Sequence, residues 1–335
     1  RYYLSNAGPA GEDPAANQSL YSRLPFDNTG VEGRMLIRVS PAGGRIWRTG
    51  AGVRYTDQVY DIDDPPYELS DGRYDDLGWL AEPGQPFSRD QGRTVFPFVW
   101  VHSLGRRWEK ARFVMQYGPV EDLATEFQLD LKFGPAGGNV GSTTGYAEDR
   151  VRFEGVLARW IRLAGGHMFV RGNGMGDAGS SQVSWYRYEA LGGWVGKAGA
   201  EMSPWITRLW AEYAQGSNLN GDRALLLGLD RGMRTLDFDG MAGDHLVRWN
   251  VEQGKAMPWD ILGLVRGGFA VFYNGGRAWW KDEGRDLEAL QHELGFGLRF
   301  GPTRSANSMV SRIDVTWDLD GTGSPAFTAI TRGFF

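Results

Sequence analysis

Leu-Gly-Leu-Asp-Arg-Gly-Met-Arg-Thr-Leu-Asp-Phe-Asp-Gly runs from Leu227 to Gly240, and Gly-Asp-His-Leu-Val-Arg-Trp-Asn-Val-Glu follows from Gly243 to Glu252. The first part is rich in glycine and aspartate and has no sustained periodicity, which is typical of a loop. The second part alternates, which predicts a strand. One face of that strand carries Leu246, Arg248, Asn250 and Glu252, and the other carries Val247, Trp249 and Val251.

The composition favours a protein made of strands. The chain has 335 residues, 49 glycines, 13% aromatic residues and a net charge of -5. This mixture suits many strands joined by turns. No apolar run approaches the ~18 residues of a spanning helix, but a spanning barrel keeps its polar residues inside and shows no such run. The lack of cysteine excludes disulfides and cysteine-bound metals, and the mild acidity argues against nucleic acid as a partner.

The alternation of the first stretch recurs along the chain. Within 124–133, for example, Phe127, Leu129 and Leu131 lie opposite Asp130 and Lys132. No amphipathic helix and no repeat of fixed period is found, so the predicted class is all-β with antiparallel hairpins. Strands are predicted at about 31–40, 45–60, 94–103, 107–117, 124–133, 151–162, 167–172, 182–195, 205–214, 245–253, 263–274, 290–300, 308–318 and 326–335.

Strand length and charge distinguish a membrane barrel from a soluble sandwich. The predicted strands have about nine to twelve residues, which matches the ~9–11 of a tilted membrane crossing. Their polar faces carry charges of both signs along the whole strand, and aromatic residues gather near strand ends, as in the interfacial girdles of barrels. We therefore predict a transmembrane antiparallel β-barrel whose apolar faces point outward.

Length and loop composition give the domain organisation. Residues 1–30 are predicted to be an irregular linker or plug, and 31–335 the barrel, with a loop at 215–244 folded into its lumen. The acidic insertion at 61–93 could hold calcium, but it lacks EF-hand spacing, and a solvated loop is the prediction. The length suits sixteen strands although about fourteen are readable, and strand parity indicates that one hairpin is misassigned or hidden in 1–93. The chain begins at Arg1 without methionine or signal peptide, so we expect a processed or partial chain.

The first stretch resembles the sixth-loop motif of the outer-membrane assembly factor superfamily, which includes the BamA and TamA insertases and the two-partner-secretion transporters (the bacterial surface antigen family). The family pattern is roughly Leu-Gly-Gly-Asp-x-Gly-Leu-Arg-Gly-Tyr, then Gly-Asp, a strand and a glutamate. It is matched here by Leu227, Gly228, Asp230, Gly232, Met233, Arg234, Gly243, Asp244 and Glu252. The segment Val271–Trp279 is similar to the family's Phe-x-Asp-x-Gly-x-x-Trp strand. The resemblance covers about 220–335 well and the rest by general pattern.

The resemblance implies that the loop turns back into the lumen and that its arginine bonds acidic residues of the wall. The strand phase points Glu252 and Asn274 inward, so we predict that Arg234 pairs with Glu252 and that Asn274 adds a hydrogen bond. Thr235 and Leu236 replace the family's glycine and aromatic residue, and Asn274 replaces its aspartate. A weaker latch, or one completed by another residue, is expected.

The implied function is insertion of β-barrel proteins, or export of polypeptides, through a seam between the first and last strands. We place the seam between the strand near residues 31–40 and the strand containing Phe327, Gly333 and Phe335. Exposed strand edges can template an incoming strand. The implied location is the outer membrane of a Gram-negative-type bacterium. The implied partners are its lipids, unfolded barrel or secreted polypeptide clients, and other subunits or a separate periplasmic domain, since the family's polypeptide-transport-associated domains are not found in this chain.

Other functions remain open. The barrel could be an anchor or subunit of a larger complex without insertase activity, a passive diffusion pore, or, outside the membrane class, the chain could be a carbohydrate-binding β-protein. An enzyme is the weakest class: the four histidines lack metal-ligand spacing, and the glycines of 172–176 precede no helix. Asp314 and Asp318 are interpreted as lumen-lining residues. No catalytic residue, metal or cofactor is predicted.

Overall fold

The structure is a computed structural model. It describes residues 2–5, 21–24, 26–39, 44–60, 92–117, 119–136, 150–179, 185–219, 224–236, 240–281, 290–304, 309–321 and 324–332. Its elements in chain order are β1 (Tyr2–Ser5), β2 (Tyr21–Leu24), β3 (Phe26–Arg38), β4 (Ile46–Tyr60), β5 (Gly92–Leu104), β6 (Trp108–Arg112), β7 (Val120–Ala124), β8 (Gln128–Pro135), β9 (Arg150–Leu163), β10 (Gly166–Gly179), β11 (Trp185–Ala200), β12 (Ser203–Ser217), β13 (Leu225–Leu227), the 3-10 turn η4 (Leu229–Arg231), β14 (Met241–Gly243), β15 (His245–Ile261), β16 (Val265–Trp279), β17 (Gln291–Pro302), β18 (Val310–Asp318) and β19 (Pro325–Arg332).

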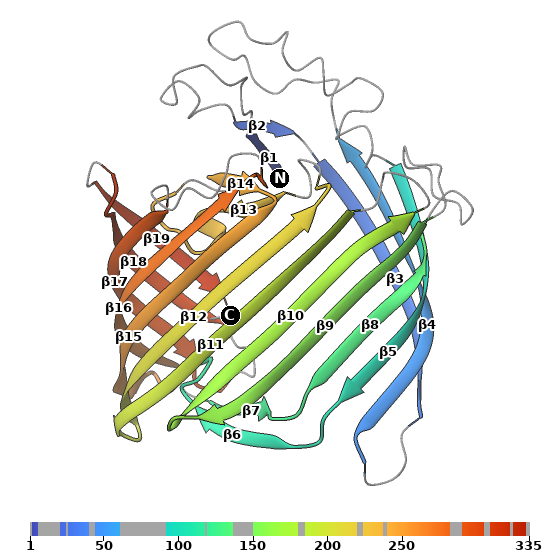
Figure 1. The fold of residues 1–335 in the computed structure, drawn as a ribbon. Helices are drawn as coiled ribbons and strands as arrows, with labels where there is room; N and C mark the ends of the chain where they lie inside the picture. The colour runs from blue at the N-terminus through green and yellow to red at the C-terminus, as the bar shows by residue number, and fades with distance from the viewer. Residues whose placement is uncertain are drawn as a thin grey trace, which may run out of the picture.

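One large antiparallel sheet dominates the molecule. Its thirteen strands follow the order β19-β18-β17-β16-β15-β12-β11-β10-β9-β8-β5-β4-β3. Figure 1 shows the sheet curled, with its long strands tilted together. The pairs β1–β2, β6–β7 and β13–β14 form three separate small sheets. The all-β, antiparallel class predicted from the sequence is confirmed.

The ends of the large sheet are β3 and β19, and no pairing joins them among the residues that the structure describes. Each strand is antiparallel to its neighbour, so in a series of thirteen the first and the last run in the same direction. We call the end of the sheet where β12 stops and β15 starts the upper rim, and the opposite end the lower rim, as oriented in Figure 1.

The large sheet has thirteen strands within the described residues, where the chain length suggested sixteen and about fourteen were readable. The strand predicted at 107–117 is wrong. Only Trp108–Arg112 is extended, and it pairs with β7 outside the large sheet. Alternation stops after Arg112, because Phe113, Val114 and Met115 are all apolar, and Phe113 takes a positive φ of 60° that ends the strand. Without this strand in the count, β4 ends at the upper rim, where the long connection from β12 to β15 also lies. Counting 107–117 as a wall strand therefore accounts for the mismatch in strand parity.

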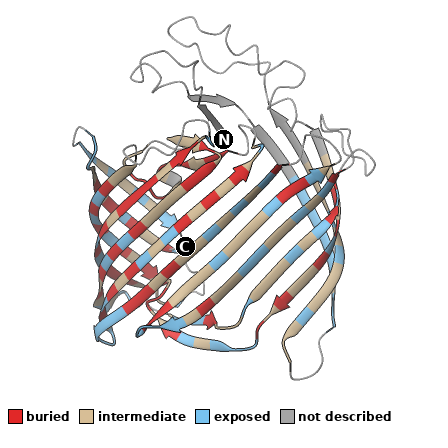
Figure 2. Ribbon diagram, viewed as in Figure 1, coloured by how far each residue is buried: buried red, intermediate tan, exposed pale blue. Residues whose placement is uncertain are grey.

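The two faces of the sheet are inverted relative to a soluble sandwich, as the sequence predicts. Met35, Phe133 and Val271 on the outer face are 73%, 59% and 52% exposed. Arg299 and Glu293, which point to the concave face, are fully buried. Figure 2 shows exposed and buried residues alternating along the strands. We call the concave side, which carries Arg208, Glu252 and Arg299, the inner face.

Short turns of the type typical of hairpins join strands at the lower rim, with two residues between β9 and β10 and three between β15 and β16. Ala164 and Gly165 between β9 and β10 have φ values of 48° and 73°, and Leu262 and Gly263 between β15 and β16 have 51° and 65°. Two successive positive φ angles give a turn whose twist matches that of the strands. Connections at the lower rim are therefore short here, and the long connection between β12 and β15 lies at the upper rim.

Several predicted features fall on other parts of the chain. Within the predicted irregular segment 1–30, β1 pairs with β2 and β3 already begins at Phe26. Residues 61–91 of the acidic insertion, with the calcium alternative, lie outside the described residues, as do Gly333 and Phe335. Among the residues that the structure describes, no helix has the length and apolar character needed to cross a membrane.

Candidate functional site

The connection from β12 to β15 is called the upper loop here. It is described for 218–219, 224–236 and 240–244, and it folds onto the inner face. Its ends pair as β13 and β14, and η4 lies between them. Leu225, Leu227 and Met233 are buried against Leu246 of β15 and Ala278 of β16. This small apolar cluster fixes the loop against the wall, so the predicted inward fold of the motif agrees with the structure.

The motif glycines shape the turn that presents Arg234. The carbonyl of Gly228 accepts the backbone N–H groups of Arg231 and Met233 at 3.0 and 3.1 Å. Gly232 ends η4 with a φ of 102°, in the region that favours glycine. The backbone of Asp230 lies within η4. Glycine at position 232 is therefore needed to reverse the chain immediately before Met233 and Arg234.

Replacing Gly232 with alanine is expected to destabilise the folded protein by about 1–3 kcal/mol, because a side chain is strained at this φ. The measurement is the midpoint of urea unfolding, followed by tryptophan fluorescence. Gly174→Ala on β10 is the matched control, since a Cβ there meets no atom within 4 Å. Equal midpoints for the two variants would contradict a conformational requirement at Gly232.

Arg234 is 5% exposed and lies between two carboxylates of the wall. Its Nε donates to Asp314 Oδ2 at 2.7 Å, and its Nη1 donates to Glu293 Oε1 at 3.5 Å. Its guanidinium also stacks over the ring of Phe272, 4.0 Å from the centroid. A buried cation needs such partners, because an unpaired one costs several kcal/mol.

Glu293 is the main acceptor for the upper loop. Its Oε2 accepts the backbone N–H of Arg234 at 2.7 Å, and the N–H and hydroxyl of Thr235 at 3.0 and 3.1 Å. Asn274 Nδ2 also donates to its Oε1. The hydroxyl of Thr235 thus adds one hydrogen bond that a glycine at this position could not make, and Glu293, which was not among the predicted partners, completes the latch.

The predicted partner Glu252 is wrong, and the predicted partner Asn274 does contact the loop. Asn274 Nδ2 donates to the carbonyl of Gly232 at 3.2 Å and is itself bonded by Asn250. Glu252 points inward as the strand phase predicts, but two other arginines take its oxygens. Arg208 reaches Oε1 at 3.1 Å, and Arg299 reaches Oε2 at 3.1 and 2.7 Å. The strand phase gave the face correctly and the pairing incorrectly.

Arg299 links the two acidic groups. Besides Glu252 it donates to Asp314, the carboxylate that also holds Arg234. The result is a continuous series of alternating charges, named here the arginine–carboxylate chain. Its members, all at most 5% exposed, are Glu293, Arg234, Asp314, Arg299, Glu252 and Arg208.

The far end of this chain meets a second insertion that the sequence did not predict. Residues 105–127, called the lower hairpin, join β5 to β8 at the lower rim and contain β6 and β7 (Figure 1). Arg208 donates to the carbonyls of Val114 and Phe113 at 3.2 and 3.4 Å and to Tyr117 Oη at 3.4 Å. The consecutive apolar residues after Arg112 are the signal that could have identified it.

The lower hairpin packs against inner-face residues from widely separated strands. Phe113, Val114 and Tyr117 form one core cluster with residues of the wall. The wall members are Trp160 of β9, Val195 of β11, Ile206 of β12, Ala256 of β15 and Val310 of β18. Contact with both β9 and β18 means that the hairpin occupies the space enclosed by the curled sheet.

The turn of the lower hairpin is organised by Glu121. Its carboxylate accepts the backbone N–H groups of Val114, Met115 and Gln116 at 2.9, 2.7 and 3.3 Å. Burial raises the pKa of the Glu121 carboxyl, and the three N–H donors act in the opposite direction. The turn therefore keeps its shape through hydrogen bonds made within the hairpin itself.

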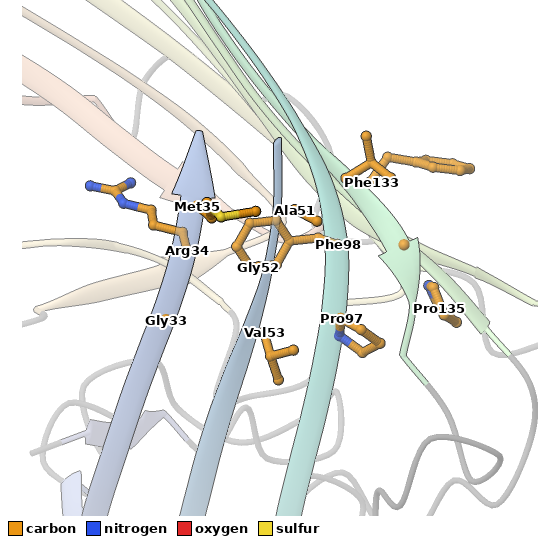
Figure 3. A pocket seen from close by; sticks show the side chains of 12 residues that line it. Gly33, Arg34, Met35, Ala51, Gly52, Val53, Pro97, Phe98, Phe133 and Pro135 are labelled. Atoms are coloured by element: carbon orange, nitrogen blue, oxygen red, sulfur yellow. The ribbon is translucent and has the colours of Figure 1, made fainter. Parts of the chain in front are cut away.

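The sheet edges form the second part of the candidate site. Phe327 on β19 is 76% exposed and Met35 is exposed on β3. A groove with an almost wholly apolar lining starts at Gly33 and Met35 and crosses β4 and β5 to Phe133 and Pro135 of β8 (Figure 3). An exposed edge beside an apolar groove is able to receive another strand or a lipid chain.

No protein-family model matches this chain, and no curated protein matches it in sequence. Within the described part of the chain, no group of three or more histidine, aspartate or glutamate residues is arranged to hold a metal ion.

Proposed function

We propose that this chain is the membrane-spanning part of an outer-membrane insertase or polypeptide translocator that works through a lateral seam between β3 and β19. The observation that carries the proposal is that, among the described residues, the edges β3 and β19 of the large sheet have no partner strand. Because β3 and β19 run in the same direction, one added strand of opposite direction is antiparallel to both. The clients are unfolded β-barrel proteins or secreted polypeptides, and the surrounding partners are outer-membrane lipids.

Two further observations support a membrane-spanning barrel as the working form. The outer face is apolar and exposed, while charged groups are buried on the inner face. Strands β9 to β12, β15 and β16 have 14 to 17 residues, long enough for a tilted crossing. A passive diffusion pore is less well supported, because the upper loop and the lower hairpin both fill inner space.

The test joins the two edges in the cysteine-free protein. Arg34→Cys on β3 and Thr328→Cys on β19 are linked by a short, reducible bismaleimide. The protein in lipid vesicles is then assayed for folding of an unfolded barrel client. We expect the untreated protein to accelerate client insertion, and the cross-link to reduce the rate at least tenfold until reduction restores it.

The control cross-link is Met35→Cys with Ala51→Cys, which are direct partners in the β3–β4 ladder. It joins two strands that are already paired, so client insertion is expected to continue. Full activity with the seam joined, or no acceleration over empty vesicles by the untreated protein, would contradict the proposal.

A further inference from the structure

The upper loop and the lower hairpin enter the inner space from opposite rims, and the arginine–carboxylate chain runs from one to the other. Near its upper end, Arg234 of the upper loop contacts Glu293 and Asp314, and at its lower end Arg208 holds hairpin carbonyls. Between them, Asp314 is shared by Arg234 and Arg299, and Glu252 is shared by Arg299 and Arg208. We propose that the arginine–carboxylate chain couples the upper loop to the lower hairpin, so that release of one insertion loosens the other.

The coupling arises because neighbouring arginines share the same carboxylates. When Arg234 leaves, Asp314 keeps only Arg299 of its two arginines, and Arg299 is then drawn toward Asp314. That movement weakens the contact of Arg299 with Glu252, which in turn changes the position of Arg208 under the hairpin. Because the members of this network are buried, each of these shifts costs free energy. The members therefore do not behave independently.

Phe272 provides a second link. Its ring lies beneath both Arg234 and Arg299, at 4.0 and 5.5 Å from the two guanidinium carbons. Loss of the Arg234 guanidinium removes one of the two cations beside this buried ring and leaves Arg299 as the other.

Tyr117 of the lower hairpin packs against β15, β16 and β17, and two of these strands, β15 and β17, carry Glu252 and Arg299. The ring lies against three glycines of adjacent strands, where an added Cβ would come within 3.0 Å of Oη at Gly254, 2.5 Å of Cε1 at Gly268 and 3.0 Å of Cβ at Gly301. Gly254 follows Glu252 by two positions on β15, and Gly301 follows Arg299 by two on β17. Each pair shares a strand and the inner face. Displacement of either charged residue is thus transmitted to the surface on which the hairpin rests.

The test uses a reporter cysteine in the lower hairpin, Met115→Cys, in the otherwise cysteine-free full chain folded in lipid vesicles. The rate of labelling by a hydrophilic maleimide is compared with and without Arg234→Met. We expect Arg234→Met to raise the rate roughly tenfold, although residue 234 lies in the other insertion. An unchanged rate would overturn the coupling.

Arg248→Met is the matched control, because Arg248 also holds the upper loop but lies off the chain. It donates to the carbonyl of Arg231 and pairs with Glu212 at 2.8 Å. We expect less than a twofold change in labelling of the hairpin. An equal acceleration by Arg248→Met would overturn the role of the chain, because any loosening of the loop would then suffice.

Coupling free energies are reciprocal, so an effect is also expected in the reverse direction. A reporter at Leu236→Cys in the upper loop is expected to label roughly tenfold faster with Arg208→Met. Arg159→Met is the control. Arg159 also holds the lower hairpin, because it donates to the carbonyl of Thr125 at 2.9 Å, but it is not a member of the arginine–carboxylate chain. If Arg234→Met or Arg208→Met fails to show the gel mobility of the folded protein, lysine replaces methionine in these two variants and in both controls. The same order of labelling rates is expected.

Discussion

Replacing Arg234 with methionine is expected to destabilise the folded protein by about 3–5 kcal/mol, the usual range when one partner of a buried ion pair is removed. Methionine keeps much of the volume over the Phe272 ring but leaves Asp314 and Glu293 without the guanidinium. Their negative charge then remains in a buried site. The measurement is urea unfolding of the protein folded in lipid vesicles, followed by tryptophan fluorescence.

Arg107→Met is the control for this prediction. Arg107 has an 85% exposed side chain and contacts Glu126 at 3.4 Å, an ion pair of the kind that contributes about 0–1 kcal/mol. Arg234→Lys is expected to fall between the two, because a single ammonium cannot reproduce the fork that reaches both carboxylates. A loss below about 1 kcal/mol in Arg234→Met would show that the latch does not stabilise the fold.

The inward fold of the upper loop was implied by the resemblance of its motif, and the residues alone predict a glycine-rich loop followed, after Gly243, by an alternating strand. The face of each strand follows from its period of two, which is why Glu252 and Asn274 were correctly placed inward. The ion-pair partner of each inward-facing residue does not follow from this period. Glu252, Glu293 and Asp314 lie on three different strands, and the sequence phase gives all three the same direction without saying which arginine each one meets.

The same limit explains how Asp314 was undervalued. Alone on its strand it is an ordinary inner-face residue, and only the register of β17 with β18 brings it beside Arg299 and within reach of the loop. Register across several strands is a non-local property. The lower hairpin is hard to predict for another reason: β6 alternates like a wall strand, so the pattern predicts one strand that continues through Phe113.

Two glycines of β17, Gly295 and Gly297, have a role that the alternating pattern does not predict. Between the inward-facing Glu293 and Arg299, the inner positions of β17 are these two glycines, and each leaves room for a neighbour. A Cβ at Gly295 would overlap the Phe272 ring, and one at Gly297 would overlap Asp314 Oδ1 and the backbone carbonyl of Ile313. Glycine normally weakens a strand, so its use here is explained by the groups that occupy the space.

Gly297→Ala is therefore expected to destabilise the protein by about 3 kcal/mol or more, combining overpacking with displacement of Asp314 from its two arginines. The overlap with the Ile313 carbonyl cannot be relieved by a side-chain rotation, so β18 itself must move away from β17. The control is Gly172→Ala on β10, where a Cβ meets no atom within 4 Å and the change is expected to be neutral or stabilising by about 0.5 kcal/mol. Urea unfolding in vesicles measures both variants. If Gly297→Ala unfolds at the midpoint of Gly172→Ala, the carboxylate of Asp314 does not occupy the position on which the arginine–carboxylate chain depends.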